Sequence, residues 1–156
     1  MKRIFTSLAV AGLLVFVSAV LSVPTPTTKA ATPAMIGHEG GCSLRQVAGH
    51  WGHSFSGTIV GLGPAAAVGN TTINPDGSFT GSQTRSFNGD VEEETYTGSL
   101  SLNPDCTVTD TVNVYLNGAL ERVDVLNGVV TEDGRSAKAI LTTPGTAILV
   151  EYSKID

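Results

Sequence analysis

The shortness of the connections between its apolar runs is the feature that most constrains this chain. From Cys42 onward, runs rich in Val and Thr alternate with brief segments of turn residues, and no helical period of convincing length occurs. Asn117-Gly118 is the clearest turn, because both positions of a two-residue type I′ hairpin need positive φ. Short links join strands in antiparallel order, since a parallel crossover needs a dozen or more residues.

The runs predict eight strands, namely His50–Val60, Ala66–Asn74, Ser78–Phe87, Val91–Leu102, Val108–Leu116, Ala119–Val130, Ser136–Thr143 and Thr146–Lys154. Consecutive antiparallel strands form a meander, and closing the meander removes both exposed sheet edges. We therefore expect an all-β, one-domain, eight-stranded up-and-down barrel. A two-sheet β-sandwich is the alternative.

The N-terminus has the pattern of a secretory signal. Lys2 and Arg3 precede an apolar run over Leu8–Leu21, which is shorter than the roughly 20 residues of a membrane span. We expect residues 1–22 to be a signal peptide, with cleavage after Ala19, Ser22 or Ala31. The expected location is secreted or periplasmic, with no membrane association after cleavage.

The next part of the chain divides into a leader and a folded domain. Residues 23–41 are rich in Pro, Thr, Ala and Gly and predict a flexible leader, whereas residues 42–156 predict the barrel domain.

From Cys42 onward there are six basic and 13 acidic residues, an acidic balance that argues against nucleic acid as a partner. The oligomeric state stays open.

Cys42 and Cys106 are the two cysteines of the chain. An even cysteine count in an exported protein predicts a disulfide. A disulfide that closes the loop from Cys42 to Cys106 would stabilise the fold by about 4 kcal/mol in the chain-entropy model.

A two-residue turn at Asn88-Gly89 predicts the register of the hairpin around it. Four facing pairs follow: Arg85 with Glu92, Gln83 with Glu94, Gly81 with Tyr96, and Phe79 with Gly98. Two aromatic rings would then cover two strand glycines. The face that contains these pairs is the expected interior.

Following the same face around the barrel extends the expected interior. It takes in Trp51, Phe55, Ile59, Val108, Asp110, Val112, Val114, Leu116, Val123, Val125, Val129, Leu141, Ile148, Val150 and Tyr152. The valines at 123, 125 and 129 enter this set because the face is carried through Asn117-Gly118 as a two-residue turn.

Five polar residues on this interior face are the candidate ligand-binding residues: Gln83, Arg85, Glu94, Tyr96 and Asp110. A buried unpaired charge is costly, so each charge needs a partner, water or a ligand. Either the charged groups ring the barrel mouth in water, or they orient a mostly apolar ligand. In the second case Glu92 is the resting partner of Arg85, and a ligand carboxylate could replace it.

No metal or cofactor is expected. The histidines are His38, His50 and His53, and on a strand the last two point to opposite faces. Zinc needs three or four converging ligands. No Gly-x-Ser-x-Gly occurs, and no catalytic residue is assigned.

Two stretches resemble known families. Gly49-His50-Trp51 resembles the Gly-x-Trp that opens lipocalins and other calycins, with Lys154 at the basic position that packs on the tryptophan. A longer pattern resembles exported bacterial proteins of unknown function. It comprises Gly49–Thr58, Ala65–Gly69, Asp76–Gly81, Tyr96-Thr97-Gly98 and Asn103-Pro104-Asp105-Cys106-Thr107. The resemblance implies a calycin-like or allene-oxide-cyclase-like barrel and assigns no activity.

Three functions are compatible with such a barrel. The first is binding of a small apolar or amphipathic ligand in the lumen, the second an inert surface or interaction module, and the third a cyclase or isomerase acting on an unsaturated apolar substrate. An eight-stranded barrel is just wide enough to be filled by side chains or to hold one ligand. The state of the lumen therefore separates the first function from the second.

Overall fold

The computed structural model of the protein describes residues 41–155. It contains a short helix, α1 (Leu44–Val47), and the strands β1 (Gly49–Ile59), β2 (Gly63–Ile73), β3 (Ser78–Phe87), β4 (Asp90–Leu102), β5 (Thr107–Leu116), β6 (Ala119–Val130), β7 (Ser136–Leu141) and β8 (Thr146–Ile155). The predicted signal peptide and all but the last residue of the predicted leader lie outside the described residues.

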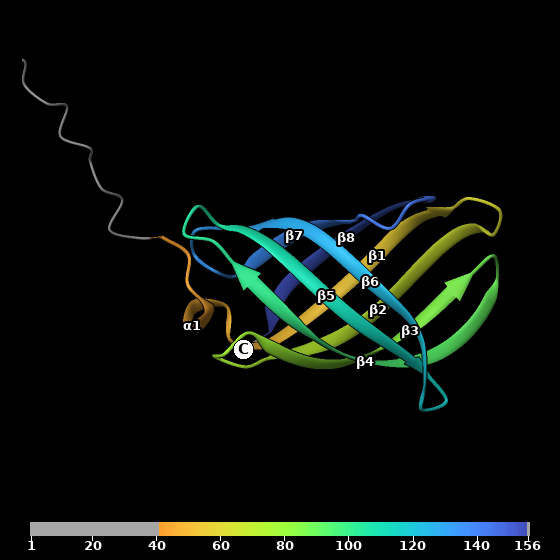
Figure 1. Ribbon diagram of the computed structural model, residues 1–156, viewed down its shortest axis with the longest axis horizontal. Coiled ribbons are helices and arrows are strands. Elements are labelled where there is room, and N and C mark those ends of the chain that lie inside the picture. The colour runs from red at the N-terminus through yellow and green to blue at the C-terminus, as the bar shows by residue number, and fades with distance from the viewer. Residues whose placement is uncertain (1–40, 156) are drawn as a thin grey trace, which may run out of the picture. The chain divides into compact units, whose positions relative to one another are not determined.

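The eight strands form one closed barrel in sequence order, with every neighbouring pair antiparallel (Figure 1). β1 pairs with β8 from His50–Ile155 to Ile59–Thr146, which joins the two ends of the meander. The barrel predicted from the short connections is confirmed, and the two-sheet sandwich is not formed.

The predicted register of the β3–β4 hairpin is also confirmed. Gly81 pairs with Tyr96, and Phe79 pairs with Gly98. A Cβ atom on Gly81 would lie 2.3 Å from the Tyr96 hydroxyl oxygen, and one on Gly98 would lie 2.3 Å from the Phe79 ring. Both positions need glycine because an aromatic ring occupies the space of the missing side chain.

The inner face of β6 differs from the expectation. Val123, Val125 and Val129 face outward and are 49%, 37% and 56% exposed. Near the Asn117-Gly118 turn the register shifts: Val114 pairs with Arg122, but the next residue, Tyr115, pairs with Leu120, which leaves Glu121 as an extra residue. Such a bulge moves a strand by one residue and turns every side chain to the other face.

As a result, β6 presents Arg122, Asp124, Leu126 and Val130 to the interior. The pairing shows this directly: Arg122 lies opposite Val114, Asp124 opposite Val112, and Leu126 opposite Asp110. Two charged side chains therefore stand where valines were expected.

Helix α1 covers one end of the barrel, and the sequence analysis did not predict it. Val47 packs with Trp51, Val108 and Val130 in a buried cluster. The Trp51 indole N–H donates to the Val47 carbonyl at 2.8 Å, and the Lys154 ammonium donates to the Gln46 carbonyl at 2.9 Å. Trp51 is 2% exposed, so its predicted place in the interior is confirmed.

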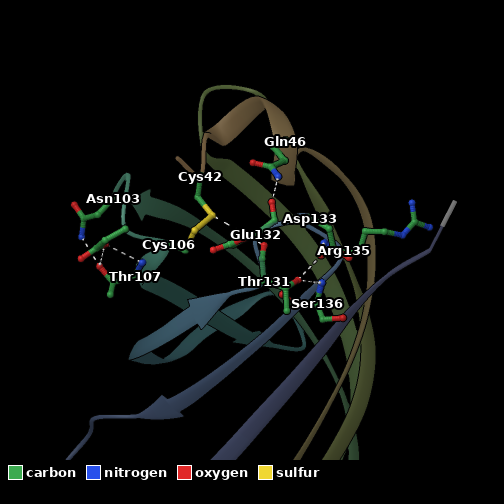
Figure 2. Close-up of a disulfide and its surroundings, with 11 residues drawn as sticks. Cys42, Gln46, Asn103, Cys106, Thr107, Thr131, Glu132, Asp133, Arg135 and Ser136 are labelled. Atoms are coloured by element: carbon green, nitrogen blue, oxygen red, sulfur yellow. Dashed lines mark hydrogen bonds between the residues drawn. A yellow bond between two sulfur atoms is a disulfide. The ribbon is translucent and has the colours of Figure 1, made fainter. Parts of the chain in front are cut away.

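The predicted disulfide joins Cys42 to Cys106, with a Cα–Cα distance of 5.0 Å (Figure 2). It ties the segment that enters α1 to the turn between β4 and β5. Beside it, the Gln46 side-chain amide donates to the Glu132 carbonyl in the turn between β6 and β7. The covered end is thus held by the disulfide and by hydrogen bonds that join α1 to β1, to β8 and to the turn between β6 and β7.

The orientation of β6 can be tested with two leucines of that strand. Leu126→Ala should lower the free energy of unfolding by about 2–5 kcal/mol, as buried leucine truncations do, because Leu126 is 6% exposed. Leu120→Ala is the matched control; Leu120 is 55% exposed, and the change should stay within about 0.5 kcal/mol. Urea denaturation measures both, and equal losses would contradict the shifted register.

Candidate functional site

The lumen of the barrel contains a cavity of about 330 Å³. Its lining is mainly apolar and includes Phe55, Val112, Leu126 and Ile148. The lining extends to Thr143 and Pro144 between β7 and β8, at the end of the barrel away from α1. A smaller cavity of about 40 Å³ lies against Val47 and Trp51 at the covered end.

A chain of hydrogen bonds along one wall of the lumen fixes the tautomer of His53. The Gln83 amide N–H donates to the Glu94 carboxylate at 2.6 Å, so the Gln83 amide oxygen faces His53 Nε2 at 3.1 Å. His53 Nε2 must then carry the proton, because an amide oxygen only accepts. Burial lowers the pKa of His53, against an opposing effect of the Gln83 hydrogen bond, and the ring is neutral near pH 7.

The other ring nitrogen of His53, Nδ1, is an acceptor with one long contact. Tyr96 lies 3.4 Å away, but its hydroxyl proton goes to the Asn70 carbonyl at 2.7 Å, and the Thr71 hydroxyl donates to the Tyr96 oxygen at 2.7 Å. His53 Nδ1 can therefore accept a hydrogen bond or a proton from a molecule in the lumen. Burial raises the pKa of Tyr96 to about 12, so this residue stays neutral.

Glu94 is the centre of a buried ion-pair cluster. Its side chain is fully buried and accepts from Arg85 Nε at 2.7 Å and from Arg122 at 2.6 and 2.9 Å. Burial on its own would raise the pKa of Glu94, but hydrogen bonds from Arg122, Gln83 and Arg85 outweigh it and lower the pKa to about 2. Arg85 also pairs with Glu92, as the sequence predicted.

Asp110 is a buried carboxyl group without such support. It is 8% exposed, and its Oδ1 atom is buried with no hydrogen-bond partner. It lines both cavities, as does Tyr152. Burial raises the pKa of Asp110 from 3.8 to about 7.

The five candidate residues of the sequence analysis thus separate into two groups. Gln83, Tyr96 and Asp110 line the main cavity, whereas Arg85 and Glu94 are not among its lining residues and are paired with each other. Neither charge of that pair stands in water at a rim: Arg85 is 5% and Glu94 1% exposed. A direct contact of these five residues with a ligand stays a prediction.

The sequence analysis missed other polar lining residues, namely His53, Thr71, Arg122, Asp124, Thr143 and Thr146. His53 could have been found, because strand alternation puts it on the same face as Trp51 and Phe55. Arg122 and Asp124 could not, since their orientation depends on the bulge in β6. The other histidine of β1, His50, is exposed on the outer face and hydrogen-bonded to Thr72.

Within residues 41–155, no three His, Cys, Asp or Glu side chains gather as they would around a metal ion. The described part of the chain also has no helix that is both long and apolar enough to cross a membrane.

No protein-family model, no curated protein and no solved structure matches this chain. The class of protein is therefore defined by fold and site alone. It is a closed, eight-stranded up-and-down β-barrel of calycin-like architecture, with an apolar cavity in its lumen.

The stability of the protein should depend on pH through Asp110. Its pKa is higher in the folded protein than in the unfolded chain, so protonation favours folding; this contribution is complete below pH 3.8 and is lost as the pH rises towards 7. Asp110→Asn should remove that loss of stability. Denaturant unfolding across this pH range measures the effect, and an unchanged pH profile would contradict it.

Asp105→Asn is a control of opposite sign. Hydrogen bonds from Thr107 lower the pKa of Asp105, so the stability it contributes is present above the pKa of the unfolded chain and is lost as the pH falls through the folded value. Asp105→Asn should therefore reduce the loss of stability that the wild-type protein shows as the pH falls into the acid range.

Proposed function

We propose that the protein is an exported binding module that holds a small, mainly apolar ligand in the lumen of its barrel. The observation that carries the proposal is the cavity of about 330 Å³, which lies in the size range of ligand pockets and has an apolar lining. A few polar groups converge on it, among them His53, Tyr96 and Asp110. A pocket of this composition binds by burial and orients the ligand by a few hydrogen bonds.

The proposed export is supported by the disulfide, since such bonds persist in oxidising compartments outside the cytosol. A relation to the calycins is supported at the covered end. Trp51 of the Gly-x-Trp sequence is buried there, and its register partner on β8 is Lys154. The secreted or periplasmic location and the relation to exported bacterial barrels are parts of this proposal.

Catalysis by a cyclase or isomerase is a second candidate, favoured by one observation. The neutral His53, whose Nδ1 has only a long contact with Tyr96, lines an apolar lumen, where a base can take a proton from a bound molecule. Both functions require a ligand to bind in the lumen, so binding is tested before catalysis.

Octanol is a suitable neutral probe. Isothermal titration calorimetry at several temperatures should show saturable one-to-one binding with a negative heat-capacity change, because apolar surface is buried. Val112→Phe places a larger side chain in the cavity and should weaken binding about tenfold or more, whereas Val125→Phe makes the same change on the outer face of β6 and should bind like the wild type.

Circular dichroism before titration establishes that both variants are folded. Absence of saturable binding by the wild-type protein, or equal binding by the two variants, would overturn the proposed function in favour of an inert barrel.

A further inference from the structure

Asp110 is a buried charged residue that the chain itself leaves without a partner. The side chain is more than nine-tenths buried, and its Oδ1 atom has no hydrogen-bond partner. An unsatisfied buried carboxyl group destabilises a fold, so its presence in the lumen calls for a partner that the chain itself does not supply. The residue borders both cavities, where a ligand can reach it.

Each nitrogen donor group of the lumen already donates to a partner within the chain. Arg122 donates through Nε to Asp124 and through both terminal nitrogens to Glu94. The Gln83 amide donates to Glu94, and His53 Nε2 donates to Gln83. Asp110 Oδ1 is buried with no hydrogen-bond partner, and His53 Nδ1 has only a long contact of 3.4 Å with the Tyr96 hydroxyl. The lining therefore favours a ligand that donates hydrogen bonds over one that accepts them.

The net charge beside the cavity also favours a ligand that donates hydrogen bonds. The ion-pair cluster joins two arginines to five carboxylates, an excess of three negative charges: Arg85 and Arg122 with Asp90, Glu92, Glu94, Glu121 and Asp124. Both arginines are already paired with carboxylates, so an anionic ligand would have to displace one of them. The summed field at the cavity attracts cations and repels carboxylates and phosphates.

We propose that the ligand is an apolar amine, whose ammonium group donates to the carboxylate of Asp110 while its hydrocarbon part fills the lumen. The inference rests on the proposed function and names its ligand class. Asp110 borders the small cavity beside Trp51, so the ammonium group lies at the covered end and the hydrocarbon extends along Leu126 and Ile148 towards Thr143 and Pro144.

The ionisation of Asp110 and Tyr152 is compatible with this ligand. Asp110 ionises near neutral pH, so little free energy is needed to charge it when a cation arrives. Tyr152 lies close by: burial, with Asp110 and Tyr96 as further causes, raises its pKa, and its neutral hydroxyl can accept a second ammonium proton.

Three probes with the same hydrocarbon and different ends test the proposal: octylamine, octanol and octanoate. In calorimetric titrations of the wild-type protein at neutral pH, octylamine should bind about tenfold or more tightly than octanol, because hydrogen bonds to charged groups are the stronger ones. Octanoate should bind more weakly than octanol. This comparison needs no variant and does not depend on the folding of any.

Asp110→Asn locates the effect at one carboxylate. The variant should reduce octylamine affinity to about that of octanol and leave octanol binding within about threefold, since only the ionic partner is lost. Glu93→Gln is the matched control, because it removes one negative charge from the exposed, outward face of β4. It should keep the full preference for the amine.

The outcomes separate the two proposals. If no probe binds, the proposed function fails and this inference fails with it. If octanol binds but octylamine binds no more tightly, or octanoate binds best, or Asp110→Asn keeps the preference for the amine, the ligand class is wrong while the binding function stands.

Discussion

The pairing of β1 with β8 is the interaction on which the rest of the structure depends. Each of the other strand pairs joins neighbours in sequence, but this one joins the first strand to the last over ten residue pairs. Without it the meander would be an open sheet with two unpaired edges and no lumen. The same pairing puts Trp51 opposite Lys154, whose ammonium group holds α1 over the covered end.

The two ends of the barrel are built from different interactions. At the covered end, apolar packing of Val47 and Trp51, a disulfide and several hydrogen bonds hold the chain in place (Figure 2). Towards the other end, charged side chains in the wall pair with each other instead of packing against apolar groups.

Glu94 shows how the wall tolerates buried charge. It lies on β4, and its two arginines come from β3 and β6, so its hydrogen bonds connect strands that are not all neighbours. A buried carboxylate with four such bonds is stable as an anion, and removal of either arginine would leave its charge with a single arginine partner. Asp110 faces the same lumen without a comparable partner, and this contrast makes it the informative residue of the site.

The sequence by itself determined the barrel, the disulfide and the register of the β3–β4 hairpin, because these depend on local turn chemistry, on alternation along a strand and on a cysteine pair. It also identified Gln83, Tyr96 and Asp110 as interior residues for the same reason. Only the tertiary structure decided which face of β6 is inside, since one extra residue at Glu121 reverses the alternation and leaves no mark in the hydrophobic pattern. It likewise decided that Glu94 has partners and that Asp110 Oδ1 has none, because hydrogen bonds between distant strands exist only once the barrel is closed.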